Sequence, residues 1–162
     1  MIRKFLATTA VALAAAGTIL AGASGAAAAA VPVGTAQAPA VCTAATVIQI
    51  NSFVFQPSTV APGASAAAVL AGTNCTAQTQ ATTQTWFGQF LSASGTGIPA
   101  GCAAIDPYNR AITYGPNQSV TDSTGYLVLS TCTANALKVT VKITNSSGVL
   151  LTQASAILII EQ

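Results

Sequence analysis

The chain has 162 residues, of which only eight are charged, and it contains no histidine. Hydrophobic residues make up 52% of it, but 35 positions are alanine and 13 of those fall among the first 30 residues. Without histidine, a His-ligated metal site and any Ser-His or Cys-His nucleophile pair are excluded. The composition therefore favours a protein that is not an enzyme and that holds no metal or other cofactor.

The first 30 residues follow the order of a secretory signal peptide. Arg3 and Lys4 form a short positive region, an apolar stretch runs from residue 5 to 20, and a run of five alanines ends at Ala30. This order predicts cleavage after Ala30. The alternative is a transmembrane anchor, but the apolar part is short and diluted by alanine, and no basic run follows it. We therefore expect a secreted, extracellular protein, which includes association with the cell wall.

Removal of that segment is predicted to leave a protein without net charge. Five basic residues minus Arg3 and Lys4 leave three, and these equal the three acidic residues. Nucleic-acid binding requires clustered positive charge, so we do not expect nucleic acid as a partner. The same balance argues against an anionic membrane or a heparin-like polymer as a partner.

Residues 31–41 are rich in Pro, Gly and Ala, which indicates a flexible leader. Residues 42–162 show no change of composition and are expected to form one domain. Their Thr, Val, Ile and Ser content and their frequent turn residues favour strands. Seven strands are predicted, over 47–55, 65–73, 82–90, 108–114, 119–129, 137–144 and 149–160.

The sixth predicted strand carries the clearest pattern. Aliphatic residues alternate with lysine and threonine, so one face is expected to be buried and the other wet, with Leu137, Val139, Val141 and Ile143 against Lys138, Thr140, Lys142 and Thr144. The last strand is apolar on both faces and is predicted to lie centrally in its sheet. Together these short antiparallel strands predict an all-β, two-sheet sandwich.

Four cysteines lie in the predicted domain, at Cys42, Cys75, Cys102 and Cys132. An even number in an exported chain predicts two disulfides. Zinc is the alternative, but no C-x-x-C pair occurs. In an up-and-down order of strands, Cys42 and Cys75 lie at one end of the sandwich and the other two at the opposite end. We therefore expect the pairs Cys42–Cys75 and Cys102–Cys132.

Two segments, FVFQPSTVAPGAS at 53–65 and GPNQS at 115–119, together with the second strand's end at Asn74, resemble bacterial immunoglobulin-like modules of the CARDB and fibronectin-like kind. With its signal peptide and its Ala-Thr usage, the chain is also similar to small exported proteins of actinobacteria. The resemblance covers roughly residues 47–160. It implies an immunoglobulin-like sandwich of about seven strands that serves adhesion or ligand presentation. The antibody-type order Cys-Trp-Cys leaves a Cys75–Cys132 pair as the alternative.

Strand 108–114 is the first candidate binding element, because Tyr108, Arg110, Ile112 and Tyr114 share one of its faces. If that face is exposed, the two tyrosines can stack on sugars while the arginine donates hydrogen bonds. If it is buried, the same residues pack in the core and Arg110 extends to the edge. The second case is favoured, because aromatic residues on strands are more often packing residues.

Trp86 and Phe87 point to opposite faces of their strand. We expect Trp86 in the core and Phe87 on the exposed face, where Thr83, Thr85 and Gln89 surround it. That face is either a surface for a glycan or a protein partner, or simply a threonine-rich wet face.

Asp106 and Asp122 are the candidate carboxylate pair for catalysis of the glycosidase type. The simpler alternative pairs Asp106 with Arg110 or places it at a turn before Pro107. Because no nucleophile, base or phosphate-binding loop accompanies these carboxylates, catalysis is not expected.

The first functional hypothesis is a secreted binding or adhesion module that acts at or near the cell surface. Its partner would be a wall polymer, a glycan, another protein or a second copy of the chain, the last through sheet edges. The alternative is an extracellular carrier of a small apolar ligand. That hypothesis requires a concave apolar pocket of about 300 Å³ or more in a cleft between the sheets.

Overall fold

The computed structural model describes residues 42–43, 45–93 and 97–162, so the predicted signal peptide (1–30) and leader (31–41) lie outside the described residues. No helix that is long and apolar enough to cross a membrane occurs in this part of the chain. The eight strands are β1 (Ile48–Gln56), β2 (Thr59–Val60), β3 (Ser65–Asn74), β4 (Gln80–Leu91), β5 (Tyr108–Tyr114), β6 (Ser119–Leu127), β7 (Ala136–Asn145) and β8 (Leu150–Ile160).

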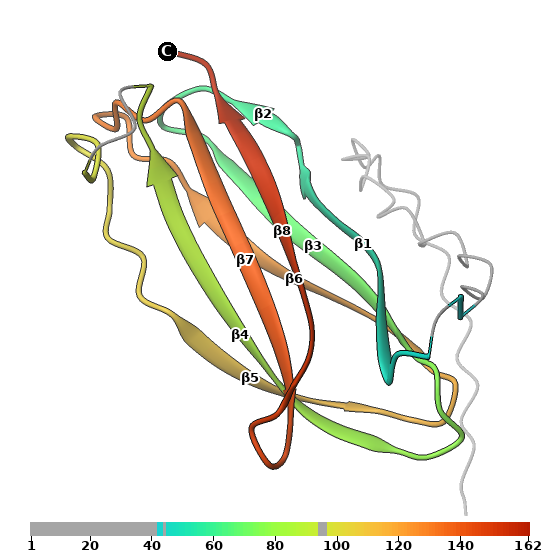
Figure 1. The fold of residues 1–162 in the computed structure, drawn as a ribbon. Coiled ribbons are helices and arrows are strands. Elements are labelled where there is room, and N and C mark those ends of the chain that lie inside the picture. The colour runs from blue at the N-terminus through green and yellow to red at the C-terminus, as the bar shows by residue number, and fades with distance from the viewer. Residues whose placement is uncertain (1–41, 44, 94–96) are drawn as a thin grey trace, which may run out of the picture. The chain divides into compact units, whose positions relative to one another are not determined.

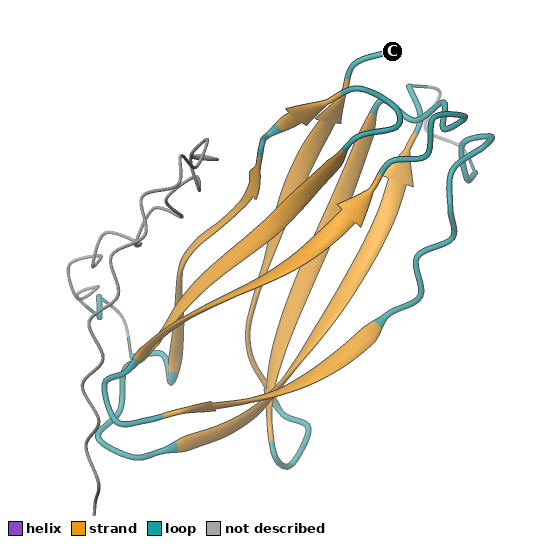
Figure 2. Ribbon diagram, turned by 180° about the vertical axis from the view of Figure 1, so that it is seen from behind, coloured by secondary structure: helices purple, strands orange, loops and turns teal. Residues whose placement is uncertain are grey.

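The strands form two sheets that face each other (Figures 1 and 2). One sheet has the order β1-β3-β6, and the other has the order β2-β8-β7-β4-β5. All neighbours are antiparallel except β2 and β8, which are parallel. The expected all-β, two-sheet architecture is therefore confirmed. The expectation of seven antiparallel strands is not met, because the larger sheet is mixed and contains the additional strand β2.

Strand β2 arises where the chain changes sheets. After Gln56 the chain passes through Pro57, whose preceding peptide bond is cis, and leaves the three-stranded sheet. Thr59 and Val60 then pair with Ile159 and Ile160 at the end of β8. Two residues are too few to show a period-two pattern, and their partner lies about a hundred positions away in sequence. For that reason the sequence pattern did not predict this strand.

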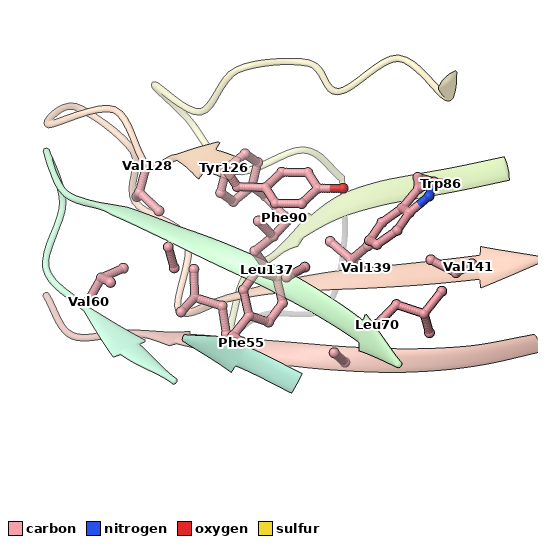
Figure 3. Packing of buried hydrophobic residues seen from close by; sticks show 14 of the residues in the cluster. Phe55, Val60, Leu70, Trp86, Phe90, Tyr126, Val128, Leu137, Val139 and Val141 are labelled. Carbon is pink, nitrogen blue, oxygen red and sulfur yellow. The ribbon is translucent and has the colours of Figure 1, made fainter. Parts of the chain in front are cut away.

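The core lies between the two sheets (Figure 3). The four inward residues of β7 predicted from the alternation are all completely buried, while Lys138 and Lys142 are exposed. Strand β8 lies between β7 and β2, as its predicted central position requires, but only one of its faces is buried. Leu158 and Ile160 are buried, but Ile157 and Ile159 on the outer face are 54% and 47% exposed. Strand β8 is flanked by β7 and the short β2, and its outer face remains open.

A buried polar group organises the middle of this core. Gln84 of β4 is 1% exposed and lies between Trp86 and Tyr114, which are each 1% exposed. The Trp86 indole N–H donates to Gln84 Oε1 at 3.1 Å, and Gln84 Nε2 donates to the Tyr114 hydroxyl at 3.2 Å. Because a buried amide is costly without partners, these two aromatic residues stabilise Gln84 in the interior.

Both disulfides have the expected pairing, Cys42–Cys75 and Cys102–Cys132. The first follows the end of β3, and the second follows the end of β6, whose Leu127 pairs with the start of β3 at Ser65. The two bonds therefore lie at opposite ends of the sandwich. The alternative pair Cys75–Cys132 does not occur.

The hydrogen bond to Tyr114 provides a test of the core. Tyr114→Phe removes the acceptor of Gln84 Nε2, so we expect the free energy of unfolding to fall by about 1–3 kcal/mol. Tyr126→Phe is the matched control, because Tyr126 is also buried (9% exposed) and its hydroxyl makes no hydrogen bond within the described residues. Urea denaturation of both variants makes the comparison, and equal losses would contradict the role assigned to Gln84.

Candidate functional site

Strand β4 is longer than the partner on one of its edges. It pairs with β7 from Thr82 to Leu91, but with β5 only from Gln80 to Trp86, where the register ends at Tyr108. The last five residues of β4, 87–91, therefore have no strand beside them on that edge among the described residues. The connection that leads back to β5 runs along this edge instead.

This arrangement leaves a groove, which we call the β4 edge groove. Its volume is about 380 Å³. It is lined by residues 88–92 from the end of β4 and by Gly97, Ile98 and residues 103–105 from the β4–β5 connection. None of these residues is charged. The groove is therefore concave and mostly apolar, with Gln89 and Ser92 as its polar side chains.

Two glycines allow the connection to lie close to its neighbours. A Cβ at Gly88 would lie 2.8 Å from Ile105, so the bare backbone of β4 provides the space for that side chain. Gly101 has a φ of +69°, and a Cβ there would lie 1.9 Å from the carbonyl oxygen of Thr131. The disulfide Cys102–Cys132 holds the connection at the same place. The part of the wall formed by residues 103–105 is thus held by the neighbouring disulfide and by close packing.

The face of β5 that carries the predicted candidates points toward the other sheet. Tyr108 stacks on Trp86 with ring centroids 6.3 Å apart, and the Arg110 guanidinium lies 5.5 Å from the Tyr108 ring and 5.9 Å from the Trp86 ring. Arg110 also forms an ion pair with Asp122 of β6, and Tyr108 bonds to Thr124 of the same strand. These contacts join the edge strands of the two sheets.

Of the two alternatives for this face of β5, the structure therefore matches the one in which the face is buried. Tyr114 is closed to solvent, and Ile112 packs against the core. Arg110 has a side-chain exposure of 32% and reaches the edge of the sandwich, as expected. Its partner, however, is Asp122 rather than Asp106, which is exposed. Tyr108 and Arg110 are thus brought together, while a role of either in binding a ligand stays a prediction.

Burial and neighbouring polar groups shift the pKa values of Arg110, Tyr114 and Tyr126. The hydrogen bond to Asp122 raises the pKa of Arg110 above its ordinary value, although partial burial opposes this. Burial raises the pKa of Tyr126 to about 12, with a further increase from Tyr108 and an opposing decrease from Arg110. Burial also raises the pKa of Tyr114, although the hydrogen bond from Gln84 opposes it. Both buried tyrosines are therefore held in the neutral form.

Phe87 lies on the outer face of the five-stranded sheet, on the opposite side of β4 from Trp86. It is partly exposed, and Lys142 Nζ lies 5.2 Å from its ring centroid. Around it Thr85 donates to Asn109 at 2.6 Å, and the hydroxyls of Thr140 and Ser155 lie 2.8 Å apart. Phe87 is therefore separated from the other three candidates, Tyr108, Arg110 and Tyr114, by the thickness of the sheet.

Sequence reasoning did not find the β4 edge groove. The groove depends on where the pairing of β5 with β4 ends and on the return path of a connection without periodicity. Gly88 within an otherwise regular strand was the available signal, since an isolated glycine in a strand often marks the close approach of another segment.

Comparison with known proteins gives a likeness of fold. No family model and no curated protein matches the chain. The chain is similar to the alkylpurine DNA glycosylase AlkC of Pseudomonas fluorescens, bound to DNA with an abasic site analog, with a TM-score of 0.54 and 14% identity over 74% of this chain and 32% of that one. The chain thus spans about a third of that protein's length.

Two further solved structures match more weakly. They are a Niemann-Pick type C2 protein from Japanese carpenter ant (TM-score 0.45, 11% identity, 71% of this chain and 93% of that one) and the sporulation control protein of Bacillus subtilis (TM-score 0.45, 10% identity, 72% and 50%). These two matches carry no argument, and the likeness to the glycosylase is one of fold alone.

The pKa of Tyr126 predicts a loss of stability in alkali. Its folded value of about 12 exceeds the ordinary value of about 10, so its contribution is complete below pH 10 and is lost as the pH rises from about 10 to 12. In this range the free energy of unfolding should fall by about 1.4 kcal/mol per pH unit for this group. Denaturation at pH 8, 10 and 11 tests this, and Tyr126→Phe should show a smaller decrease. An unchanged decrease would contradict the assignment.

Proposed function

We propose that this chain is an exported, non-catalytic binding domain that takes a small, uncharged, apolar ligand in the β4 edge groove. The observation that carries this proposal is the groove's volume of about 380 Å³, which lies in the range of small-molecule sites, about 300–1,000 Å³. The absence of charge from its described lining favours an uncharged ligand. Transfer of apolar surface from water would provide the affinity.

The carrier hypothesis drawn from the sequence required a pocket between the two sheets, and this groove lies elsewhere. The space between the sheets is filled by side chains such as Trp86, Tyr114 and Leu70, which are each about 1% exposed. The groove instead lies beside the edge of one sheet, where β5 has left β4. A ligand there would touch Phe90, Leu91, Ile98 and Ile105, while Gln89 and Ser92 would orient its polar atoms.

We also propose that the chain is exported and that its fold is immunoglobulin-like. Two disulfides in one small domain support an oxidising compartment outside the cytosol. Two facing sheets support the classification, as does a first strand that changes sheets after Gln56. The similarity of residues 53–65 to modules of the CARDB and fibronectin-like kind belongs to the same proposal.

The groove hypothesis predicts binding of the uncharged probe N-phenyl-1-naphthylamine, with a rise in its fluorescence. Ala104→Phe places a ring in the groove and should weaken binding by about tenfold or more, which corresponds to about 1.4 kcal/mol. Ala77→Phe, at an exposed position of the β3–β4 connection, is the matched control. Equal binding by both variants, or no binding by the unaltered protein, would overturn the groove as the site.

A second candidate function is attachment to a polymer of the cell surface, and the outer face of the five-stranded sheet favours it. Phe87 offers a partly exposed ring there, with Lys142 beside it and the hydroxyls of Thr85, Thr140 and Ser155 nearby. Aromatic rings that lie among hydroxyls and amines suit the apolar face and polar edge of a sugar.

This second function predicts retention of the purified, oxidised protein on isolated cell wall or on an insoluble polysaccharide. Phe87→Ala should reduce the retained fraction, because it removes the ring on which a sugar would stack. Leu127→Ala is the matched control, since Leu127 is 54% exposed on the other sheet. If neither the unaltered protein nor the control is retained, attachment to the cell surface is wrong.

A further inference from the structure

Lys138 and Lys142 are the two cationic side chains in the described part of the chain that form no ion pair, because Arg110 is paired with Asp122. Both lysines belong to β7 and lie four residues apart, so both point away from the core on the same side of the sheet. At about 3.4 Å per residue, their Cα atoms are separated by roughly 14 Å. Two positive charges without a carboxylate partner are thus placed in line on one face, and Lys142 Nζ lies 5.2 Å from the Phe87 ring centroid.

Phe87 lies between these charges. In the register of β4 and β7, Phe87 is opposite Thr140, the residue midway between the two lysines. On the far side, Thr140 is opposite Ser155 of β8. The face therefore presents a lysine, an aromatic ring with hydroxyls, and a second lysine in sequence along the sheet.

No carboxylate shares the outward positions of β4, β7 and β8 with these groups. Asp122 lies at the edge between the sheets with Arg110, Asp106 precedes β5, and Glu161 follows the end of β8. A net charge near zero for residues 42–162 therefore conceals a face with two positive charges. The net charge of the predicted mature chain, which argued against an anionic partner, does not describe this surface.

We propose that the outer face of the five-stranded sheet binds an acidic polysaccharide, with the Phe87 ring packed against one sugar and Lys138 and Lys142 contacting carboxylates on either side of it. The inference rests on the second proposed function and names its partner class. Charge complementarity favours a polyanion, and the ring and hydroxyls favour a sugar chain within that class. Two lysines fall below the four to eight that typify recognition of anionic lipid surfaces.

The test compares two polymers that share a backbone. Polygalacturonate carries a carboxylate on each sugar, and its methyl ester has the same backbone with the carboxylates masked. The oxidised full chain should bind immobilised polygalacturonate at low salt and bind the ester much more weakly. Binding should also decrease as salt is raised, because exposed charges are screened within about 10 Å at 0.1 M.

The lysine variants then locate the surface. Lys138→Gln combined with Lys142→Gln should weaken binding to polygalacturonate by about 25-fold, from about fivefold for each lysine. The matched control adds Thr121→Lys and Gly125→Lys to this double variant. These positions are exposed, four residues apart on β6 in the other sheet, and a Cβ at Gly125 meets nothing within 4 Å. This control restores the net charge on the wrong face and should remain weak.

Four outcomes would overturn the inference. Equal binding to polygalacturonate and its ester would remove the acidic class, and full recovery in the control would show that net charge rather than this face is responsible. Binding to neither polymer, with retention on cell wall intact, would refute the acidic polysaccharide but leave cell-surface attachment standing. If the protein binds neither polymer and is not retained on cell wall, the second proposed function is refuted as well. An unchanged melting temperature of each variant establishes that the fold is intact.

Discussion

The alternation of strand β4 between core and solvent is the constraint on which both proposed surfaces depend. Its even-numbered residues from Thr82 to Phe90 point inward, and Phe87 points outward. A slip by one residue would exchange Trp86 and Phe87 between core and surface, because the side-chain period of a strand is two. Burial of the large Trp86 ring therefore fixes Phe87 on the outer face.

The same strand also fixes the groove. Within β4, the pairing with β7 continues to Leu91, while the pairing with β5 ends at Trp86. Stacking of Tyr108 on Trp86, and the bonds of Tyr108 and Arg110 to β6, hold the start of β5 at this point. The groove begins where this set of contacts ends. A stabilising cluster at the sheet edge and a candidate ligand site are thus adjacent parts of one arrangement.

The charged residues include an ion pair that joins the two sheets and two lysines that we propose bind a partner. Arg110 and Asp122 neutralise each other on the edge strands β5 and β6, and inward-pointing charges on edge strands oppose pairing with a second sheet. This lessens the case for self-association through those two edges. Lys138 and Lys142 lie instead on an open face without a carboxylate partner, and Lys142 lies beside the Phe87 ring. Because the chain has so few charged residues, the position of each one decides whether it joins the sheets or faces a partner.

Local sequence determined most of the architecture. The alternation over 137–144 predicted the buried and wet faces of β7, turn residues bounded the strands, and the order of strands predicted both disulfides, because each of these depends on neighbouring residues or on chain direction. The same period placed Trp86 and Phe87 on opposite faces, and the expectation that Trp86 lies in the core is confirmed.

Tertiary structure alone decided the rest. The partner of Arg110, the parallel pairing of β2 with β8, and the groove between β4 and residues 97–105 all join segments that are distant in sequence or lack periodicity. Their positions depend on which strands meet and where pairing ends, which no local pattern records. The sequence by itself determined which side chains share a face of a strand, and packing between distant strands decided which faces are covered and which side chains meet.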